Sequence, residues 1–152
     1  MGYIMDLRKK VGHDELIGVG GGIFIVKEGR VLLQRRADNG LWSMHSGAME
    51  IGETLEENAR RELFEETGLR AGELELLGIF SGEDMRHTYP NGDKVCIVQV
   101  MYIAREYEGE IKLQQEELSE LRWFDIGALP DDINPPDNQA FRALEKWFEK
   151  RK

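Results

Sequence analysis

The segment KVCIVQVMYIA, residues 94–104, is apolar at nearly every position. A strand with one face in solvent alternates polar and apolar side chains, whereas an unbroken apolar run is typical of a central strand covered on both faces. Another strand-like segment, residues 73–84, precedes it, and Asn91-Gly92 between the two is a strong hairpin signal. The sheet that holds this strand therefore needs packing partners on both sides.

Helical patterns lie before and after these strands in the chain. The last of them carries an apolar stripe, Phe141, Leu144, Trp147 and Phe148, at helical spacing. The order of strands and helices predicts an α/β fold, with a mixed sheet and helices packed on its faces. The predicted helices are residues 3–10, 55–67 and 138–150, the predicted strands are 16–27, 31–36, 73–84, 94–104 and 119–126, and the predicted loops are 38–53 and 129–139.

Composition limits the class of protein. The chain has 152 residues, 41% apolar and 32% charged, without a repeat or linker, so we expect a single domain over residues 1–152. The net charge of −9 argues against a nucleic-acid polymer as partner, because phosphate backbones bind basic surfaces. Cys96 is the only cysteine, and no apolar run reaches the roughly 18–20 residues of a membrane span. We therefore expect a cytoplasmic protein without membrane contact.

The predicted helix at residues 55–67 has clear end signals. Thr54 is a good N-cap, and Glu57 three residues later completes a capping box. Gly68 follows the last helical residue, where a left-handed conformation suits glycine. Leucines and an alanine spaced four apart form the stripe that anchors this helix on the sheet.

Glu62, Glu65 and Glu66 share one patch of this helix, because residues three and four apart are neighbours. Acids in the last turn cost about 0.3–1 kcal/mol each, since the unpaired carbonyls there carry partial negative charge. Three carboxylates in one patch suit a hard divalent cation such as Mg²⁺, which would offset that cost. The alternative is a solvated face, stabilised by i,i+4 pairs such as Glu57–Arg61. The helix alone leaves both interpretations open.

The helix belongs to a longer pattern. Residues 47–69, GAMEIGETLEENARRELFEETGL, have the spacing G-x5-E-x7-R-E-U-x-E-E-x-G-U, where U is aliphatic. All nine specified positions agree with the Nudix box, and on this motif the chain resembles the Nudix hydrolase family. The segments VLLQRR, NGLW and ELRWF also resemble the family, so the likeness extends over about residues 18–148.

The resemblance implies an α/β/α sandwich around a mixed sheet. It also implies an enzyme that uses Mg²⁺ or Mn²⁺ to hydrolyse a phosphoanhydride bond in a nucleoside diphosphate linked to another group. Glu62, Glu65 and Glu66 would be metal ligands, and Arg61 would orient carboxylates, with a surface ion pair as the alternative. Glu53 would lie near the metal, where it binds through water or positions the nucleophile.

The general base in the family is either the glutamate that matches Glu53 or one on a later loop. Glu117 best matches the later one by its spacing from Trp123, and a solvated loop acid is the equal alternative.

The family usually has Pro-Gly-Gly ahead of the box, with a backbone carbonyl as a metal ligand. This chain has His45-Ser46-Gly47. A carbonyl survives any substitution, so Ser46 is predicted to keep this ligand if its backbone can adopt the conformation that glycine allows. We interpret His45 as a loop histidine that replaces proline.

Four residues are predicted to contact substrate. Arg35 and Arg36 end a strand beside the box, and because alternate side chains point to opposite faces, one should face the phosphates and the other solvent. Tyr89, near the hairpin, is expected to line the substrate cleft. NPPDNQAF, residues 134–141, resembles a loop in which an asparagine reads the base in triphosphate-cleaving members. Asn138 matches that asparagine, and helix N-capping is the alternative role.

These features favour a (deoxy)nucleoside triphosphate that is cleaved to monophosphate and pyrophosphate. ADP-ribose, a nucleotide sugar and a dinucleoside polyphosphate are alternatives. The ADP-ribose branch tends to carry a proline about fifteen residues after the box, where this chain has Asp84. A nucleotide-sensing Nudix module without activity is an alternative of another class, although such modules usually lose box carboxylates and this chain retains them. The apolar stripe of the last helix also suits a partner or a homodimer interface.

Overall fold

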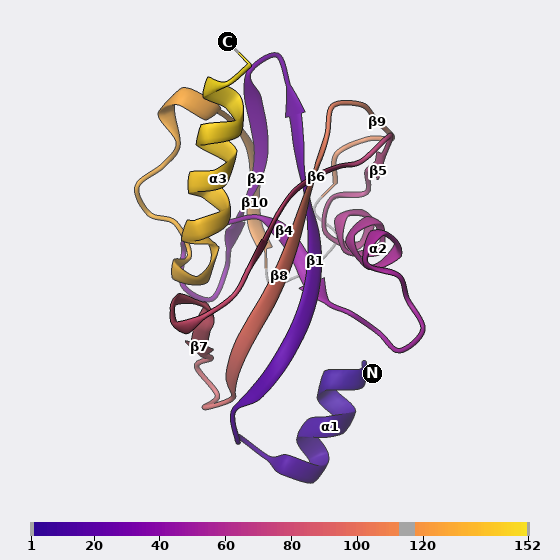
Figure 1. The fold of residues 1–152 in the computed structure, drawn as a ribbon, viewed down its shortest axis with the longest axis vertical. Helices are drawn as coiled ribbons and strands as arrows, with labels where there is room; N and C mark the ends of the chain where they lie inside the picture. Colours follow the sequence, from indigo (N-terminus) through magenta and orange to yellow (C-terminus); the bar gives the residue numbers. More distant parts are fainter. Residues whose placement is uncertain (1, 113–117, 152) are drawn as a thin grey trace.

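The computed structural model describes residues 2–112 and 118–151. Figure 1 shows the elements in chain order by colour. The helices are α1 (Tyr3–Val11), α2 (Leu55–Thr67) and α3 (Asn138–Glu149), with short 3-10 turns η1 (Glu83–Met85), η2 (Ile126–Ala128) and η3 (Pro135–Asp137). The strands are β1 (Leu16–Lys27), β2 (Arg30–Arg36), β3 (Trp42–Ser43), β4 (His45–Ala48), β5 (Arg70–Ala71), β6 (Glu75–Phe80), β7 (Arg86–Thr88), β8 (Lys94–Ala104), β9 (Tyr107–Glu108) and β10 (Leu118–Asp125).

The main sheet is mixed and curved. Its central order is β10-β2-β1-β8-β6, while β3, β4 and β7 pair with β2, β1 and β8. The long strands β1 and β8 run parallel, from Leu16↔Val95 to Ile25↔Ala104, and the other pairs are antiparallel. The continuous apolar segment at residues 94–104 is therefore an interior strand, as its composition predicts.

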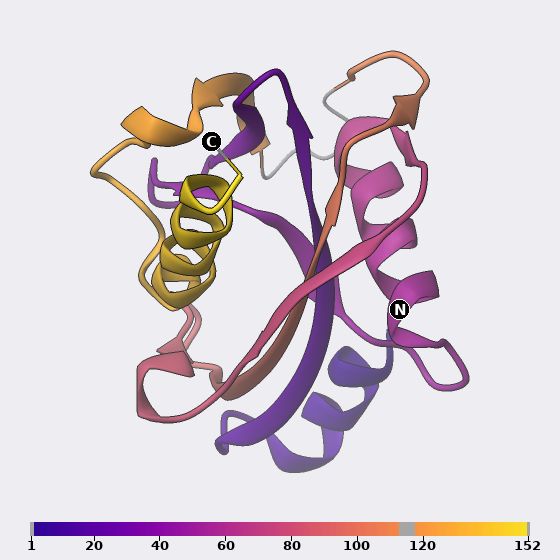
Figure 2. The same ribbon diagram turned by 45° about the horizontal axis from the view of Figure 1, so that its top comes forward.

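Two hydrophobic clusters cover the two faces of the sheet. Alternate residues of β1 supply them: Phe24 and Val26 enter one cluster, whereas Ile23 and Ile25 enter the other. The first cluster includes Phe141 and Leu144 of α3, and the second includes residues of α2. Figure 2 shows α3 and α2 on opposite sides of the sheet. The predicted α/β/α sandwich with a mixed sheet is confirmed.

The ends of α2 follow the predicted signals. Thr54 Oγ1 accepts a hydrogen bond from the Glu57 amide at 3.1 Å, and Glu57 Oε1 accepts one from the Thr54 amide at 2.8 Å. Gly68 has φ 81°, the left-handed conformation expected after the last turn. These local contacts fix where α2 begins and ends, and thereby which way its glutamates point.

The segment at residues 38–53 was predicted as a loop, and this prediction is wrong in part. It contains β3 and β4, and β4 pairs with the glycines of β1, for example Gly22↔Ser46. A side chain at Gly22 would collide with the His45 carbonyl oxygen, and one at Gly21 would lie 2.8 Å from Asn58 Oδ1 of α2. The glycine-rich start of β1 therefore lets both β4 and α2 approach the sheet closely. The short pair β5–β9 also lies in segments that were not predicted as strands.

The apolar stripe of α3 packs on the sheet. Phe141 and Leu144 are buried in the core, and Trp147 and Phe148 pack against it. Within residues 2–112 and 118–151, no helix is long and apolar enough to cross a membrane.

Candidate active site

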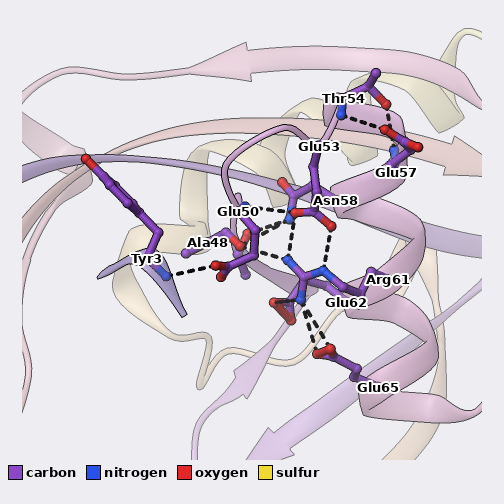
Figure 3. A network of polar contacts seen from close by, with 11 residues as sticks. Tyr3, Ala48, Glu50, Glu53, Thr54, Glu57, Asn58, Arg61, Glu62 and Glu65 are labelled. Atoms are coloured by element: carbon purple, nitrogen blue, oxygen red, sulfur yellow. Dashed lines mark hydrogen bonds and ion pairs between the residues drawn. The ribbon is translucent and has the colours of Figure 1, made fainter. Parts of the chain in front are cut away.

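Arg61 is the centre of a charged network on α2 (Figure 3). Its Nε and Nη2 donate to the two carboxylate oxygens of Glu53, at 2.6 and 2.9 Å. Its Nη1 donates to Glu62 and to Glu65, both at 3.2 Å. Nη2 also donates to the Ala48 carbonyl at 3.0 Å. One guanidinium therefore ties three box glutamates to each other and to the end of β4.

Glu53 is held on both oxygens. Besides Arg61, its Oε1 accepts the Glu50 amide at 2.8 Å, and the hydrogen bonds from Arg61 lower the pKa of Glu53. Glu50 in turn accepts the amide of Tyr3 at 2.8 Å, so the start of α1 is tied to the loop before α2. A carboxylate with a lowered pKa whose two oxygens both accept hydrogen bonds is suited to orienting Arg61 more than to accepting a proton.

Glu62 packs directly on the backbone of Gly47, where a Cβ atom would overlap its carboxylate. Burial raises the pKa of Glu62, although the Arg61 charge opposes the rise. The glycine that opens the Nudix box thus leaves room for a carboxylate.

Replacing Gly47 by alanine should displace the Glu62 carboxylate. We expect divalent-metal affinity to fall by about tenfold, the lower range for losing support of a metal ligand. Gly127→Ala is the matched control, because a Cβ there meets nothing within 4 Å. The Mg²⁺ concentration that gives half-maximal turnover is the measurement. An unchanged value for Gly47→Ala would contradict the role assigned to this contact.

Glu66 is the most buried glutamate of the box, with 7% of its surface exposed. Its Oε1 accepts a hydrogen bond from Gln34 Nε2 at 3.3 Å. Its Oε2 is buried without a hydrogen-bond partner among the described residues. Burial raises the pKa of Glu66 well above its usual range, and the nearby Glu62 charge adds to the rise.

His45 lies behind Gln34 and is fully buried. Its Nδ1 lies 2.6 Å from Gln34 Oε1, and its Nε2 lies 3.0 Å from the Leu32 carbonyl oxygen. Burial lowers the pKa of His45 to about 4. The interpretation of His45 as a simple replacement for proline is therefore incomplete, because the ring contacts the side chain that holds Glu66.

The site fits a hard divalent cation by its donor chemistry. Among the described residues, Glu66 Oε2 is a buried carboxylate oxygen without a hydrogen-bond partner. Burial and the Glu62 charge raise the pKa of Glu66, and a cation would relieve that cost of ionisation. In the described part of the chain, no three acidic, histidine or cysteine side chains already converge on one point. Glu62 and Glu65 are instead turned toward Arg61, so they would have to turn away to join Glu66.

Ser46 lies in β4, opposite Gly22, and lines the cleft beside Glu66. Among the described residues, Glu28 is the only residue other than glycine with positive φ. The backbone of Ser46 is thus ordinary strand, and serine needs no conformation reserved for glycine here.

A cleft of about 580 Å³ borders this site. Arg36 lines it together with Gln34, as expected for alternate residues of β2, whereas Arg35 lies over the ring of Trp42, 5.5 Å from its centroid. Tyr89 lines the cleft as predicted. Other residues that line the cleft are Ser46, Gly47 and Glu66 of the box region, and Asn134 and Asp137 beside α3.

The structure corrects the position of the polar residue near α3. Asn138 is exposed and does not line the cleft, and it is the first residue of α3 rather than its N-cap. Asp137 and Asn134 are buried in the cleft wall instead. Asp137 accepts the Met44 amide at 3.2 Å, and burial raises its pKa to about 7.

Sequence reasoning missed two functional candidates, Gln34 and Asp137. The signal for Gln34 is a polar residue inside the apolar run VLLQ of β2. Glu117 lies outside the described residues, so its predicted role as base or ligand stays a prediction.

Comparisons with known proteins agree with this architecture. A family model for the NUDIX domain matches residues 17–144. A crystal structure of a MutT NUDIX hydrolase from Burkholderia pseudomallei superposes with a TM-score of 0.70 at 30% identity, over 86% of this chain and 97% of that one.

Three curated relatives are named for different activities. The NAD-capped RNA hydrolase NudC of Actinobacillus succinogenes is 33% identical over 74% of this chain and 39% of its own length. The oxidized purine nucleoside triphosphate hydrolase of Danio rerio is 35% identical over 71% and 66%. The ADP-ribose pyrophosphatase of Methanocaldococcus jannaschii is 34% identical over 70% and 60%.

The chain spans about two fifths of the length of the first curated relatives that it matches. The family match nevertheless covers most of the chain, including every box residue described above. The complete box, the sandwich fold and this match together show that the chain belongs to the Nudix family.

Proposed function

We propose that the protein is a Mg²⁺-dependent pyrophosphohydrolase that cleaves a phosphoanhydride bond in a nucleotide, with Mn²⁺ as a substitute. The observation that carries the proposal is the buried Oε2 of Glu66, which has no hydrogen-bond partner in the described part of the chain and lies beside an open cleft. A buried carboxylate oxygen without a hydrogen-bond partner is costly, so its retention in a cleft wall suits a cation-binding role.

Glu62, Glu65 and Glu66, with the Ser46 carbonyl, are the groups proposed to hold the cation. A divalent cation supplies charge neutralisation for the phosphoanhydride and activation of the attacking water. Arg61 holds Glu53, Glu62 and Glu65 in one network. Because one guanidinium restrains Glu62 and Glu65 together, it limits the positions from which these two ligands can reach the cation.

Glu53 and Glu117 are the two candidates for the base that takes the proton from the attacking water. Both oxygens of Glu53 accept hydrogen bonds and its pKa is lowered, so it fits orientation of the network better than proton removal. This favours the later-loop residue Glu117 as the base. Glu117→Gln should then lower turnover with little change in metal affinity.

A (deoxy)nucleoside triphosphate is the substrate that the cleft supports best. Arg36 is a cation in the cleft for phosphate oxygens. Asn134 and Asp137 offer a buried amide and a carboxyl with a pKa of about 7, and together they can donate to and accept from a base edge. The products would be nucleoside monophosphate and pyrophosphate.

Dinucleotide substrates form the second candidate. The names of two relatives, ADP-ribose pyrophosphatase and NAD-capped RNA hydrolase, support ADP-ribose-like compounds, and nucleotide sugars or dinucleoside polyphosphates share the same linkage. The net charge of −9 disfavours a long RNA. A small-molecule nucleotide acted on in the cytoplasm, by a monomer or a homodimer, is the proposed setting.

A substrate panel tests the proposal. Canonical and oxidised dNTPs, ADP-ribose, NAD, nucleotide sugars and dinucleoside polyphosphates are incubated with the protein at fixed Mg²⁺, with EDTA as control. We expect pyrophosphate release from triphosphates and none with EDTA. Hydrolysis of the dinucleotides alone would favour the second candidate. Nucleotide binding without hydrolysis of any compound would favour a sensor and contradict the proposal.

A further inference from the structure

We propose that Gln34 and His45 position the Glu66 carboxylate for cation binding. The inference rests on the proposed role of Glu66 as a metal ligand. It assigns Gln34 and His45 a positioning role, since neither needs to touch substrate or cation to act.

The contacts form one continuous line through the interior. The Leu32 carbonyl lies 3.0 Å from His45 Nε2, His45 Nδ1 lies 2.6 Å from Gln34 Oε1, and Gln34 Nε2 donates to Glu66 Oε1 at 3.3 Å. The exposed fractions of His45, Gln34 and Glu66 are 0%, 3% and 7%. The line joins β4, β2 and α2, three elements that are distant in the sequence.

The line determines which oxygen of Glu66 is available. Gln34 holds Oε1, and Oε2 has no hydrogen-bond partner among the described residues, since His45 Nδ1 lies 4.0 Å from it. Without the amide, neither oxygen would keep a hydrogen bond within residues 2–112 and 118–151. The carboxylate would then be free to rotate about its last torsion, which is broad for this side-chain type. The free energy of ordering it would oppose cation binding.

Packing alone does not account for two polar side chains here. Leu32 and Leu33 of the same strand are fully buried apolar residues. An apolar residue at position 34 would therefore serve packing as well as Gln34 does. A buried amide and a buried imidazole must both be hydrogen bonded to avoid a desolvation cost. Polar partners that orient metal-ligating carboxylates typically contribute 10–100-fold to metal affinity or activity.

His45 acts through Gln34 and also through its own strand. His45 precedes Ser46 and Gly47 in β4. Ser46 supplies the proposed carbonyl ligand, and the Glu62 carboxylate packs on the backbone of Gly47. Its contact with the Leu32 carbonyl therefore joins the β4 side of the site to β2.

The test measures Mn²⁺ affinity directly, from the electron paramagnetic resonance signal of free Mn²⁺ in the presence of protein without nucleotide. Gln34→Met keeps the length of the side chain and removes its polar atoms. Gln99→Met is the matched control, because Gln99 is also a buried amide, on β8, and its Nε2 donates to Met101 Sδ rather than to Glu66. Glu66→Gln reports whether Glu66 binds the cation at all.

We expect Gln34→Met to weaken Mn²⁺ binding by about tenfold or more, and Gln99→Met to leave it unchanged. His45→Leu should weaken binding less than Gln34→Met. The double variant should lose less than the two single losses combined, because part of the effect of His45 passes through Gln34; fully additive losses would overturn the coupling between His45 and Gln34. If Gln34→Met does not fold, Gln34→Asn replaces it, since the shorter amide cannot reach both partners.

The two proposals fail in different ways. Unchanged Mn²⁺ affinity in Glu66→Gln would overturn the metal role of Glu66, and the proposed mechanism with it. Weakened binding in Glu66→Gln, together with a loss below about fivefold in the Gln34 variant, would overturn the positioning role alone.

Discussion

Glu66→Gln is expected to lower turnover on the order of 10³-fold while the protein stays folded and loses no stability. A lost metal-binding carboxylate removes several kcal/mol of transition-state stabilisation, and each ~1.4 kcal/mol is a factor of ten in rate. The free energy of unfolding, in contrast, should not fall. Glu66 is a buried acid whose charge is opposed by burial and by Glu62, so a neutral amide of nearly equal size relieves that cost.

Lost activity together with retained stability would show that Glu66→Gln removes a metal ligand and does not simply unfold the protein. Gln34 can still donate to the amide oxygen at position 66, because that oxygen replaces Oε1 as the acceptor. Turnover and urea unfolding are measured on the same preparations. Glu56→Gln is the control, since Glu56 is an exposed glutamate on the same helix, and its turnover should stay unchanged. Near-normal turnover in Glu66→Gln would contradict the metal assignment.

The sequence predicts α2 and its chemistry well because their causes are local. The capping box at Thr54 and the left-handed Gly68 are set by residues within a few positions, and helical spacing places the glutamates on one patch. The strand β8 can also be predicted from its own residues, because a strand buried on both faces has an unbroken run of apolar side chains.

The remaining features depend on contacts between distant segments. β4 is four residues long without alternation, and it becomes a strand because the glycines of β1 admit it. The line from His45 to Glu66 joins residues 34, 45 and 66, a proximity that no local pattern reports. The resemblance at residues 134–141 predicts a role for Asn138, but the turn η3 places Asp137 in the cleft wall and leaves Asn138 exposed.

Asp137→Asn is expected to stabilise the protein at pH 8 by roughly 4 kcal/mol, and hardly at all at pH 4. The size follows from the rise in the pKa of Asp137 from 3.8 to about 7, at about 1.4 kcal/mol for each tenfold change in proton affinity. Burial is the largest cause of the rise, and Asn removes the charge. Its amide oxygen can still accept the Met44 amide, so the hydrogen bond survives.

The sign follows from proton linkage. Between pH 4 and pH 7 the folded protein holds a proton on Asp137 that the unfolded chain has already released. Stability therefore falls as pH rises through this window, and the loss is complete above the folded pKa of about 7. The variant lacks this contribution, so the difference in unfolding free energy between variant and wild type grows from pH 4 to pH 7 and then levels off.

Urea unfolding from pH 4 to pH 8 measures this difference, and the contributions of the other titrating groups largely cancel in the comparison. Asp131→Asn makes the same substitution at an exposed position nearby, so its difference from wild type should stay near zero throughout. A difference for Asp137→Asn that is constant across the pH range would contradict the raised pKa. It would also remove the argument that this carboxyl can carry a proton toward a bound base near neutral pH.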